Sequence, residues 1–303
     1  MNNLPFDKAG QFWKGNIHTH STNSDGRVSP EEACQRYRNA GYDFISLTDH
    51  FLENYGYPMS DTRAMRTDDF TTIIGAELHT GQTEMGSAWH ILGVGLPLDF
   101  APPTPDETGS QLAARALEAG AYVAIAHPHW YVLTHEDAIS LGPDVHAVEV
   151  YNGISVDGND RADSWHFTDI LLGRGHRYTT CATDDCHFRP DYHDFGRGWV
   201  QVKSETLTPE SILGALKAGH YYASTGPELY DIQVISGEKV IVRCSPANGI
   251  FMTGTASNAR RVLGQGIIEA ELELTNFDSP YCRITVRDMQ GERAWSNPIW
   301  LDK

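Results

Sequence analysis

The sequence predicts a mixed α/β protein that ends in a small antiparallel β domain. Between about residue 12 and residue 226, short apolar runs alternate with longer amphipathic runs, as is typical of strands that alternate with helices. This alternation favours parallel strands, either in a sheet covered by helices on both faces or in a sheet closed into a barrel. After residue 227 apolar and polar residues alternate one by one, which favours antiparallel strands.

Eight apolar runs in the first part are expected to form strands, and four amphipathic runs are expected to form helices. Ser29-Pro30 and Thr208-Pro209 each place a capping hydroxyl before a first-turn proline. Glycines at positions 41, 120, 175 and 219 follow the helical runs, where a left-handed residue often ends a helix. The expected strands are residues 15–18, 43–48, 71–76, 90–95, 122–126, 147–151, 178–182 and 199–203, and the expected helices are residues 29–40, 110–119, 162–174 and 209–218.

The C-terminal region is expected to contain strands at residues 229–236, 239–244, 267–275 and 281–288. The run Asp288-Met289-Gln290-Gly291 has the composition of a turn between two strands. We therefore predict two domains, residues 1–227 and 228–303. Residues 51–69 and 96–108 are expected to be long loops, which often shape a substrate pocket.

Composition and charge argue against several classes of protein. The net charge of −17, with neutral histidines, argues against duplex nucleic acid as the main partner, because phosphate binding requires a basic face. The sequence has no run of about 18 apolar residues, so we expect no transmembrane helix, and the first residues do not resemble a secretory signal. The five cysteines are scattered without a CxxC pair, so we expect free thiols and a cytoplasmic protein.

The strongest functional signal is the run Asn16-Ile17-His18-Thr19-His20-Ser21. Two histidines one residue apart on an extended segment point the same way, because side chains alternate along a strand. Other imidazole and carboxylate residues follow further apolar runs, at the carboxyl ends of strands, where sites form in parallel α/β folds. They are His50, Glu77, His127, Glu149, Asp185 and His187, whereas His90 lies at the start of its strand.

Imidazoles and carboxylates in this pattern predict a site for zinc, manganese or iron. The absence of a cysteine cluster argues against a closed structural zinc site. Asp185 and His187 are two residues apart and share a face, whereas Asp184 faces the other way. Asp25 precedes Gly26, so a role as a turn residue is its alternative.

These motifs resemble those of the PHP (polymerase and histidinol phosphatase) superfamily of metal-dependent phosphoesterases. The resemblance covers about residues 12–226. Two runs, residues 222–227 and 295–301, also resemble the CehA/McbA-like metallohydrolase subgroup, in which carbamate hydrolysis is known. The superfamily resemblance rests on His18-Thr19-His20, Thr48-Asp49-His50, Ala126-His127-Pro128 and Asp185-Cys186-His187, with Glu77 and His90.

The resemblance implies a distorted (β/α)7 TIM-like barrel that holds two or three divalent metals. Position 25 is His in some members and Asp in others, so a two-metal site stays open. Glu77, Asp185 and His187 are the expected catalytic residues. The implied ligand sets are His18, His20, Glu77 and Asp185 for the first metal, Glu77, His90 and His127 for the second, and Asp25, His50 and His187 for the third.

We expect a metal-dependent hydrolase that cleaves a small phosphate ester by attack of a metal-bridging hydroxide. Two or three cations about 3.5–4 Å apart lower the pKa of a shared water and neutralise charge that grows in the transition state. Arg197, Arg189, Asn152 and His129 are the expected substrate contacts, and Arg197 comes first because its flanking glycines permit close approach. The expected partner is a small, phosphorylated molecule, with neither duplex nucleic acid nor a membrane, and a homo-oligomer stays open.

The sequence leaves three alternatives open. The chief alternative is hydrolysis of a carbamate, carboxyl ester or amide at the same metals. A phosphate monoester should require two or more cationic clamps in the pocket, whereas a carbamate should favour an apolar wall. The other two are a non-catalytic metal-binding module and a proofreading exonuclease. The acidic charge argues against the exonuclease, although a short oligonucleotide substrate stays open.

Overall fold

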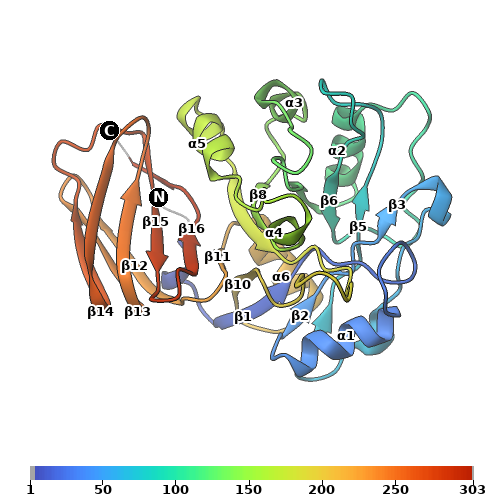
Figure 1. Cartoon of the computed structure of the whole chain (residues 1–303), viewed down its shortest axis with the longest axis horizontal. Coiled ribbons are helices and arrows are strands. Elements are labelled where there is room, and N and C mark those ends of the chain that lie inside the picture. The colour runs from blue at the N-terminus through green and yellow to red at the C-terminus, as the bar shows by residue number, and fades with distance from the viewer. Residues whose placement is uncertain (1–3, 302–303) are drawn as a thin grey trace.

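The computed structural model of the chain describes residues 4–301 and has helices packed around two β-sheets (Figure 1). In Figure 1 the C-terminal strands, coloured orange to red, lie to one side of the part that carries the helices. The helices are α1 (Pro30–Asn39), α2 (Gly109–Glu118), α3 (His135–Ser140), α4 (Ile154–Gly158), α5 (Trp165–Gly173) and α6 (Pro209–Lys217), with short 3-10 turns at Pro5–Asp7, Glu53–Tyr55 and Arg63–Met65.

The strands of the predicted α/β region overlap all eight expected runs, with the run at residues 71–76 divided into two, and they include two short strands, at residues 50–51 and 221–224, that were not predicted. They are β1 (Gln11–Asn16), β2 (Phe44–Ile45), β3 (His50–Phe51), β4 (Thr71–Thr72), β5 (Gly75–Leu78), β6 (Ile91–Val94), β7 (Tyr122–Ile125), β8 (Ala147–Asn152), β9 (Thr179–Thr183), β10 (Trp199–Ser204) and β11 (Tyr221–Ser224).

The C-terminal strands are also antiparallel, as predicted, but two of them are far longer than the alternation indicated. The turn at Asp288-Met289-Gln290-Gly291 joins two paired strands. The strands are β12 (Leu229–Ile235), β13 (Lys239–Thr253), β14 (Ala259–Glu273), β15 (Tyr281–Arg287), β16 (Arg293–Ser296) and β17 (Ile299–Trp300).

One sheet has six strands in the order β3-β5-β6-β7-β8-β9 and is mixed rather than parallel. Strand β6 runs antiparallel to both β5 and β7. The reason is local: residues 79–90 contain no helix, so the chain reverses directly after β5. The start of β6 therefore lies beside the carboxyl ends of its neighbours, and this places His90 with the other candidate ligands.

The other sheet has eleven strands, and it joins N-terminal and C-terminal parts of the chain in the order β12-β13-β15-β16-β11-β10-β1-β2-β4, with β14 paired to β13 and β17 paired to β15. Strand β16 pairs with β11, so hydrogen bonds between strands cross the predicted boundary at residue 227. The division into two domains stays a prediction.

The predicted closed (β/α)7 barrel is not confirmed, because the described strands form two separate sheets. Single backbone hydrogen bonds join these sheets where a barrel would close. The Asp185 N–H donates to the His18 carbonyl at 2.9 Å, and the His20 N–H donates to the Cys186 carbonyl at 2.8 Å. These bonds lie beyond the carboxyl ends of β1 and β9, around an isolated bridge between Thr19 and Cys186, so they do not extend the ladder of either sheet.

Two helices have the capped start that the sequence predicts. The Ser29 hydroxyl accepts from the Glu32 N–H at 3.2 Å, and Thr208 caps α6 in the same way. Helices α3 and α4 were not predicted, and they have only six and five residues. Such short segments show too little of the helical period to be found in a sequence.

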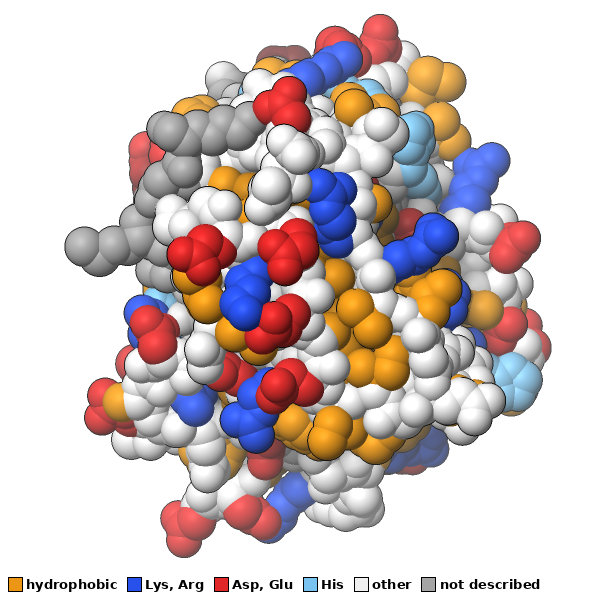
Figure 2. Space-filling view, turned by 90° about the vertical axis from the view of Figure 1, so that its left-hand side faces the viewer, with side chains coloured by type: hydrophobic (Ala, Val, Ile, Leu, Met, Phe, Trp, Pro, Cys, Tyr) orange, Lys and Arg blue, Asp and Glu red, His pale blue; other side chains and the backbone are white. Residues whose placement is uncertain are grey.

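The state of the cysteines agrees with the prediction of free thiols. All five cysteines are buried without disulfides. In residues 4–301 no helix has the length and apolar character that crossing a bilayer requires. Figure 2 shows the C-terminal face, where acidic and basic side chains lie beside a group of hydrophobic ones. Leu263 and Ile268 of β14 are 56% and 62% exposed, but a homo-oligomer stays a prediction.

Candidate metal centre

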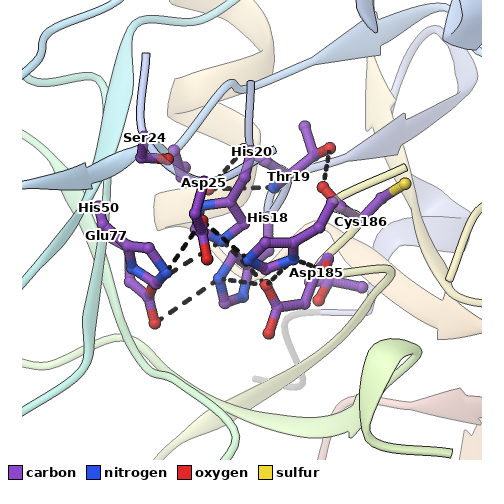
Figure 3. Close-up of polar contacts among 12 residues, drawn as sticks. His18, Thr19, His20, Ser24, Asp25, His50, Glu77, Asp185 and Cys186 are labelled. Atoms are coloured by element: carbon purple, nitrogen blue, oxygen red, sulfur yellow. Dashed lines mark hydrogen bonds and ion pairs between the residues drawn. The ribbon is translucent and has the colours of Figure 1, made fainter. Parts of the chain in front are cut away.

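The candidate ligands predicted from the sequence come together at one end of the strands (Figure 3). His18 and His20 follow β1, Glu77 lies in β5, and Asp185 and His187 follow β9. His50 begins β3, His90 directly precedes β6, and His127 comes two residues after β7. Strands that are distant in the sequence therefore deliver their side chains to a common centre.

The Glu77 carboxylate is the middle of this centre. Its side chain is only 1% exposed, and imidazoles from five segments of the chain surround it. The nearest approaches to its two oxygens are 2.6 Å from His50 Nδ1, 2.7 Å from His90 Nδ1, 3.1 Å from His127 Nε2, 3.4 Å from His79 Nε2, and 3.7 Å from both His18 Nε2 and His20 Nε2.

A second carboxylate, Asp185, lies on the other side of the His-x-His pair. Its Oδ1 is 2.9 Å from His20 Nε2 and 3.2 Å from His18 Nε2. Its backbone has a φ of 50°, in the left-handed region that non-glycine residues seldom adopt. His127 also has a positive φ, of 22°. Backbone strain of this kind persists where the surroundings fix a functional geometry.

Asp25 provides a third carboxylate from the loop that follows the His-x-His pair. Its Oδ1 is 3.1 Å from His187 Nε2 and 3.4 Å from His50 Nε2. Of the three carboxylates it is the most open, with 37% of its side chain exposed. The side chains of His50 and His90 are 16% and 22% exposed, so these three residues mark the side on which the centre meets solvent.

Four groups of these residues have ligand atoms within 4.8 Å of one another, which is close enough to share a cation. Several of these atoms are close without hydrogen-bond geometry: the buried His18 Nε2, Asp25 Oδ1 and Glu77 Oε2 have no hydrogen-bond partner in the described chain. Lone pairs that converge without bonding one another fit ligands of a cation. The groups are His20, Asp25, His50 and His187; His18, His20 and Asp185; His18, Glu77 and His127; and His50, Glu77 and His79.

The electrostatics of the centre keep its carboxylates ionised. Burial alone would raise the pKa of Glu77, but the surrounding His50, His90 and His79 rings hold that pKa well below its usual range. Asp185 behaves in the same way beside His18 and His20. The pKa of Asp25 is lowered to about 2, since contact with His187 outweighs burial.

The imidazoles differ among themselves. Burial, with the nearby His187 and His50, lowers the pKa of His20 to about 4, and burial also lowers the pKa of His90 to about 4. Burial would lower the pKa of His187 too, but Asp25 and Asp185 raise it to about 9. His20 and His90 are therefore neutral at pH 7 and ready to coordinate, whereas a cation would displace a proton from His187.

Glu149 and Asn152 lie beneath the centre rather than at its rim, where the sequence placed them. Glu149 is fully buried, accepts from His127 N–H at 2.6 Å and holds His18 Nδ1 at 2.9 Å. The Asn152 amide donates to Glu149 at 3.1 Å and to Asp185 at 3.0 Å, and its oxygen accepts from Ser155. Asn152 thus spends its polar atoms on the protein, which does not support the predicted substrate contact.

Two buried aspartates next to the ligands anchor the loops that carry them. Asp49 accepts from the Ser21 N–H at 2.7 Å and from the Ser24 and Ser60 hydroxyls at 2.7 and 2.6 Å. Asp184 accepts from three consecutive N–H groups, those of residues 196–198, at 2.6–2.8 Å. Because the Arg197 N–H is one of these donors, the backbone of Arg197 supports the site directly.

The predicted substrate contacts of Arg197, Arg189 and His129 stay predictions, and in the structure these side chains contact other groups of the protein. The Arg197 guanidinium interacts with the Tyr151 hydroxyl, and Arg189 lies over the Tyr192 ring, 5.1 Å from its centroid. His129 contacts the Asp163 carbonyl through Nδ1. Among residues 4–301 no lysine or arginine forms an ion pair with Glu77, Asp185 or Asp25.

Aromatic rings, rather than cationic side chains, border the imidazoles. The Tyr131 ring lies 5.1 Å from His90, centroid to centroid, and the Trp130 ring lies 6.2 Å from His127. On the opposite side the Tyr55 ring stacks near His50 at 6.3 Å. Tyr55 belongs to the predicted loop at residues 51–69, which therefore contributes to the surroundings of the site.

His79 is a residue of the centre whose role the sequence left open, between facing the site and belonging to the following loop. It is 3% exposed, and its Nε2 lies 2.9 Å from His50 Nδ1. The available signal was its position two residues after Glu77, which gives both side chains the same face of an extended segment. That signal alone could not separate a residue facing the site from one in the following loop.

Comparison with known proteins gives a likeness of fold. No protein-family model matches the chain, and no curated protein matches it. A two-domain protein of Bacteroides vulgatus, which contains a predicted PHP-like metal-dependent phosphoesterase, is similar over 93% of this chain and 94% of its own length. The TM-score is 0.54 and the sequence identity is 15%. The chain therefore shares the fold of that protein, which confirms the predicted resemblance to PHP-like proteins at the level of fold.

Two further solved structures are similar over shorter parts. A candidate metal-dependent phosphoesterase of Bifidobacterium adolescentis is 15% identical over 58% of this chain and 89% of its own, with a TM-score of 0.44. An amidohydrolase of Chromobacterium violaceum, with bound sulfate and no metal, is 14% identical over 57% of this chain and 87% of its own, with a TM-score of 0.41. Scores this low do not define a fold, and the CehA/McbA-like subgroup stays a prediction.

Proposed function

We propose that the chain is a metal-dependent hydrolase whose substrate is a small phosphate ester. The observation that carries the proposal is the convergence of three carboxylates and their imidazoles from seven segments of the chain, with buried ligand atoms that lack hydrogen-bond partners in the described residues. Burying so many ionisable groups together is costly unless they perform a task. Chelation of cations is the task that their atom types and separations fit best.

The contacts suggest which residues would hold each cation. We assign His18, His20 and Asp185 to the first, Glu77, His90 and His127 to the second, and Asp25, His50 and His187 to the third, with Glu77 also reaching the first set. When bound, manganese, zinc or iron would act as Lewis acids that lower the pKa of a water and polarise the substrate. The number and identity of the cations are part of the proposal.

The protein's own residues prepare the site for this chemistry. Glu77, Asp185 and Asp25 are held ionised, so they offer negative charge to cations at neutral pH. Glu149 and Asn152 orient the ligands from below and keep that side dry. The substrate is expected to enter beside Asp25, His50 and His90, because these ligands face solvent.

Support for a phosphate ester comes from the shared fold, since the Bacteroides protein contains a predicted phosphoesterase. Support for the alternative, a carbamate, carboxyl ester or amide, comes from the aromatic surroundings. Tyr131 and Trp130 border the imidazoles, and among residues 4–301 no arginine or lysine forms an ion pair with the central carboxylates. The absence of a cationic clamp among the described contacts favours this second candidate, hydrolysis of a carbamate, carboxyl ester or amide.

The experiment that tests the proposal joins metal analysis to a substrate panel. We expect purified protein to contain at least two equivalents of transition metal and to hydrolyse p-nitrophenyl phosphate faster than the matching aryl ester and aryl carbamate. Asp185→Asn should lose metal and turnover, and Asp106→Asn, an exposed control, should keep both. A protein that binds no metal under any loading would contradict the proposal, and a preference for the ester or carbamate would transfer it to the second candidate.

A further inference from the structure

We propose that His79 is a positioning residue that fixes the tautomer of His50 and so sets the place of the third cation. The inference rests on the proposed function, because it concerns how one ligand of the metal centre is prepared. It names a residue outside the ligand sets that the sequence resemblance implied.

The hydrogen bond on the far side of His79 determines its own tautomer. His79 Nδ1 lies 2.9 Å from the Trp89 carbonyl oxygen. A carbonyl can only accept, so Nδ1 must carry the hydrogen, and in a neutral ring Nε2 then carries a lone pair. The ring is 3% exposed and its Nε2 points toward the centre. Trp89 lies directly before His90, so one turn of chain supplies both the anchor for His79 and a candidate ligand.

The tautomer of His79 determines the tautomer of His50 in the same way. His79 Nε2 lies 2.9 Å from His50 Nδ1. Because Nε2 of His79 accepts, Nδ1 of His50 donates, and in the neutral ring that binds a cation His50 Nε2 keeps its lone pair. That nitrogen lies 3.4 Å from Asp25 Oδ1, in the group that also contains His20 and His187. The chain of two hydrogen bonds therefore aims a coordinating nitrogen at the third position.

Glu77 is close to the same nitrogen, but its Oε2 has no hydrogen-bond partner in the described chain, which leaves His79 as the acceptor. Glu77 Oε2 lies 2.6 Å from His50 Nδ1. Glu77 is also the carboxylate that the first two cation sets share. Because His79 accepts from His50, Glu77 Oε2 is left for a cation, whereas Oε1 is already within hydrogen-bond distance of His90 Nδ1, at 2.7 Å, and His127 Nε2, at 3.1 Å. With His79 accepting the His50 hydrogen, Glu77 does not have to accept that hydrogen as well as bind cations.

Two other imidazoles in the centre have the same arrangement with different acceptors. His18 has Nδ1 held by Glu149 at 2.9 Å while its Nε2 faces Asp185. His187 has Nδ1 held by the Asp185 carbonyl at 2.9 Å while its Nε2 faces Asp25. An acceptor behind the far nitrogen is the usual support of a metal-binding histidine. For His50 that acceptor is another imidazole.

Two polar substitutions test which nitrogen of His79 matters. In His79→Gln the amide can reach the place of Nε2, whereas in His79→Asn it reaches only the place of Nδ1. We expect His79→Asn to lose about one equivalent of metal, as Asp25→Ala should, and to bind the weakest cation about 10–100-fold less tightly. His79→Gln should recover most of this affinity. The readouts are metal per chain and the visible spectrum of cobalt-loaded protein, with circular dichroism to check folding.

Three results would overturn the inference. Full metal content and an unchanged cobalt spectrum in His79→Asn would show that His50 needs no such support. Equal losses in the Gln and Asn variants would indicate that His79 is itself a ligand, since the group of His50, Glu77 and His79 is also compact. Loss of folding in both variants would assign His79 a structural role. A wild-type protein that binds no cobalt would instead contradict the proposed function.

Discussion

Two buried polar regions of this molecule contain similar groups. In one of them several candidate ligand atoms have no hydrogen-bond partner in the described chain, and in the other the charged side chains pair with each other. The first is the metal centre around Glu77. The second is the junction between α5 and the C-terminal strands, where Arg283 of β15 meets Asp169. Arg283 donates to both Asp169 oxygens, at 2.9 and 2.7 Å, and its remaining nitrogen donates to Thr285 at 3.0 Å. Its guanidinium also lies 4.0 Å from the centroid of the Trp165 ring.

At the junction all three guanidinium nitrogens of Arg283 and both oxygens of Asp169 are hydrogen-bonded, although the buried Trp165 Nε1 has no partner among the described residues. Asn297 accepts from the Thr180 N–H at 2.8 Å and donates to the Gly219 and Tyr221 carbonyls at 3.0 and 2.9 Å. These bonds connect the C-terminal region to the starts of β9 and β11. At the metal centre, by contrast, His18 Nε2, Asp25 Oδ1 and Glu77 Oε2 are buried and unbonded in the described chain.

The two regions therefore differ in how they affect the free energy of unfolding. Satisfied polar atoms contribute to stability, and unsatisfied ones lower it until something else binds them. The junction therefore stabilises the fold, whereas the metal centre holds its ligands in place at a cost to stability. Substitutions in the two regions should separate stability from activity.

The largest effect is expected from Glu77→Gln. The amide keeps the shape of the side chain but removes the charge that the surrounding imidazoles and the cations share. We expect loss of bound metal and a fall in turnover of at least about 100-fold, the scale seen when one preorganised electrostatic contact is removed. Metal analysis and initial rates on the best substrate measure both. Turnover within twofold of wild type would show that Glu77 is not central.

The next effect tests the junction. Asp169→Ala leaves Arg283, whose side chain is 10% exposed, without its partner. We expect a loss of about 3 kcal/mol in the free energy of unfolding, because a mostly buried charge becomes unpaired. Denaturant unfolding of the metal-free protein measures this loss. Metal content of the folded protein should not change, and a parallel loss of metal would show that the two regions are coupled.

A third effect concerns pH. Asp25 and Asp185 raise the pKa of His187 to about 9, so below that pH the ring carries a proton when no cation is bound. Because a ligand must be neutral, cation binding at pH 7 should release at least this proton, and apparent affinity should rise at least about tenfold per pH unit toward pH 9, since nearby carboxylates outweigh burial and also raise the pKa values of His18, His50 and His127. Titration calorimetry in buffers of different ionisation heat measures the release. Affinity independent of pH between 7 and 9 would exclude His187 as a ligand.

The smallest effect concerns substrate choice. Trp130→Leu removes one of the rings that border the imidazoles. If an aryl group packs there, the KM for aryl esters and carbamates should rise about 3–10-fold, the value of a lost aromatic contact, while kcat stays similar. Tyr230→Leu, an exposed ring of β12, is the matched control. An unchanged KM for every aryl substrate would place the leaving group elsewhere.

The sequence predicted the candidate ligands well because their signal is local. The pair His18 and His20 shares a face by strand period, and Glu77 and Asp185 follow apolar runs whose ends must meet in an α/β fold. The compact groups of ligand atoms contain every predicted ligand except His90, and the division into metal sets stays a prediction. Helix positions were predictable for the same reason, because helix caps and the helical period depend on residues that are close together in the sequence.

What the sequence could not predict depends on contacts between distant segments. The reversal of β6, which brings His90 into the centre, follows from the absence of a helix between β5 and β6 rather than from any ligand motif. The burial of Glu149 and Asn152 depends on how β8 twists beside β9, where the register shifts. Closure of the barrel depends on strand lengths, and two-residue strands are too short to be assigned from propensity.

The most direct test of the central claim is a crystal of the manganese-loaded protein with anomalous diffraction data collected near the manganese edge. We predict at least two anomalous peaks among His18, Glu77, His127 and Asp185, and a third beside Asp25. An anomalous map without peaks there, from protein that is folded and fully loaded in solution, would contradict the account.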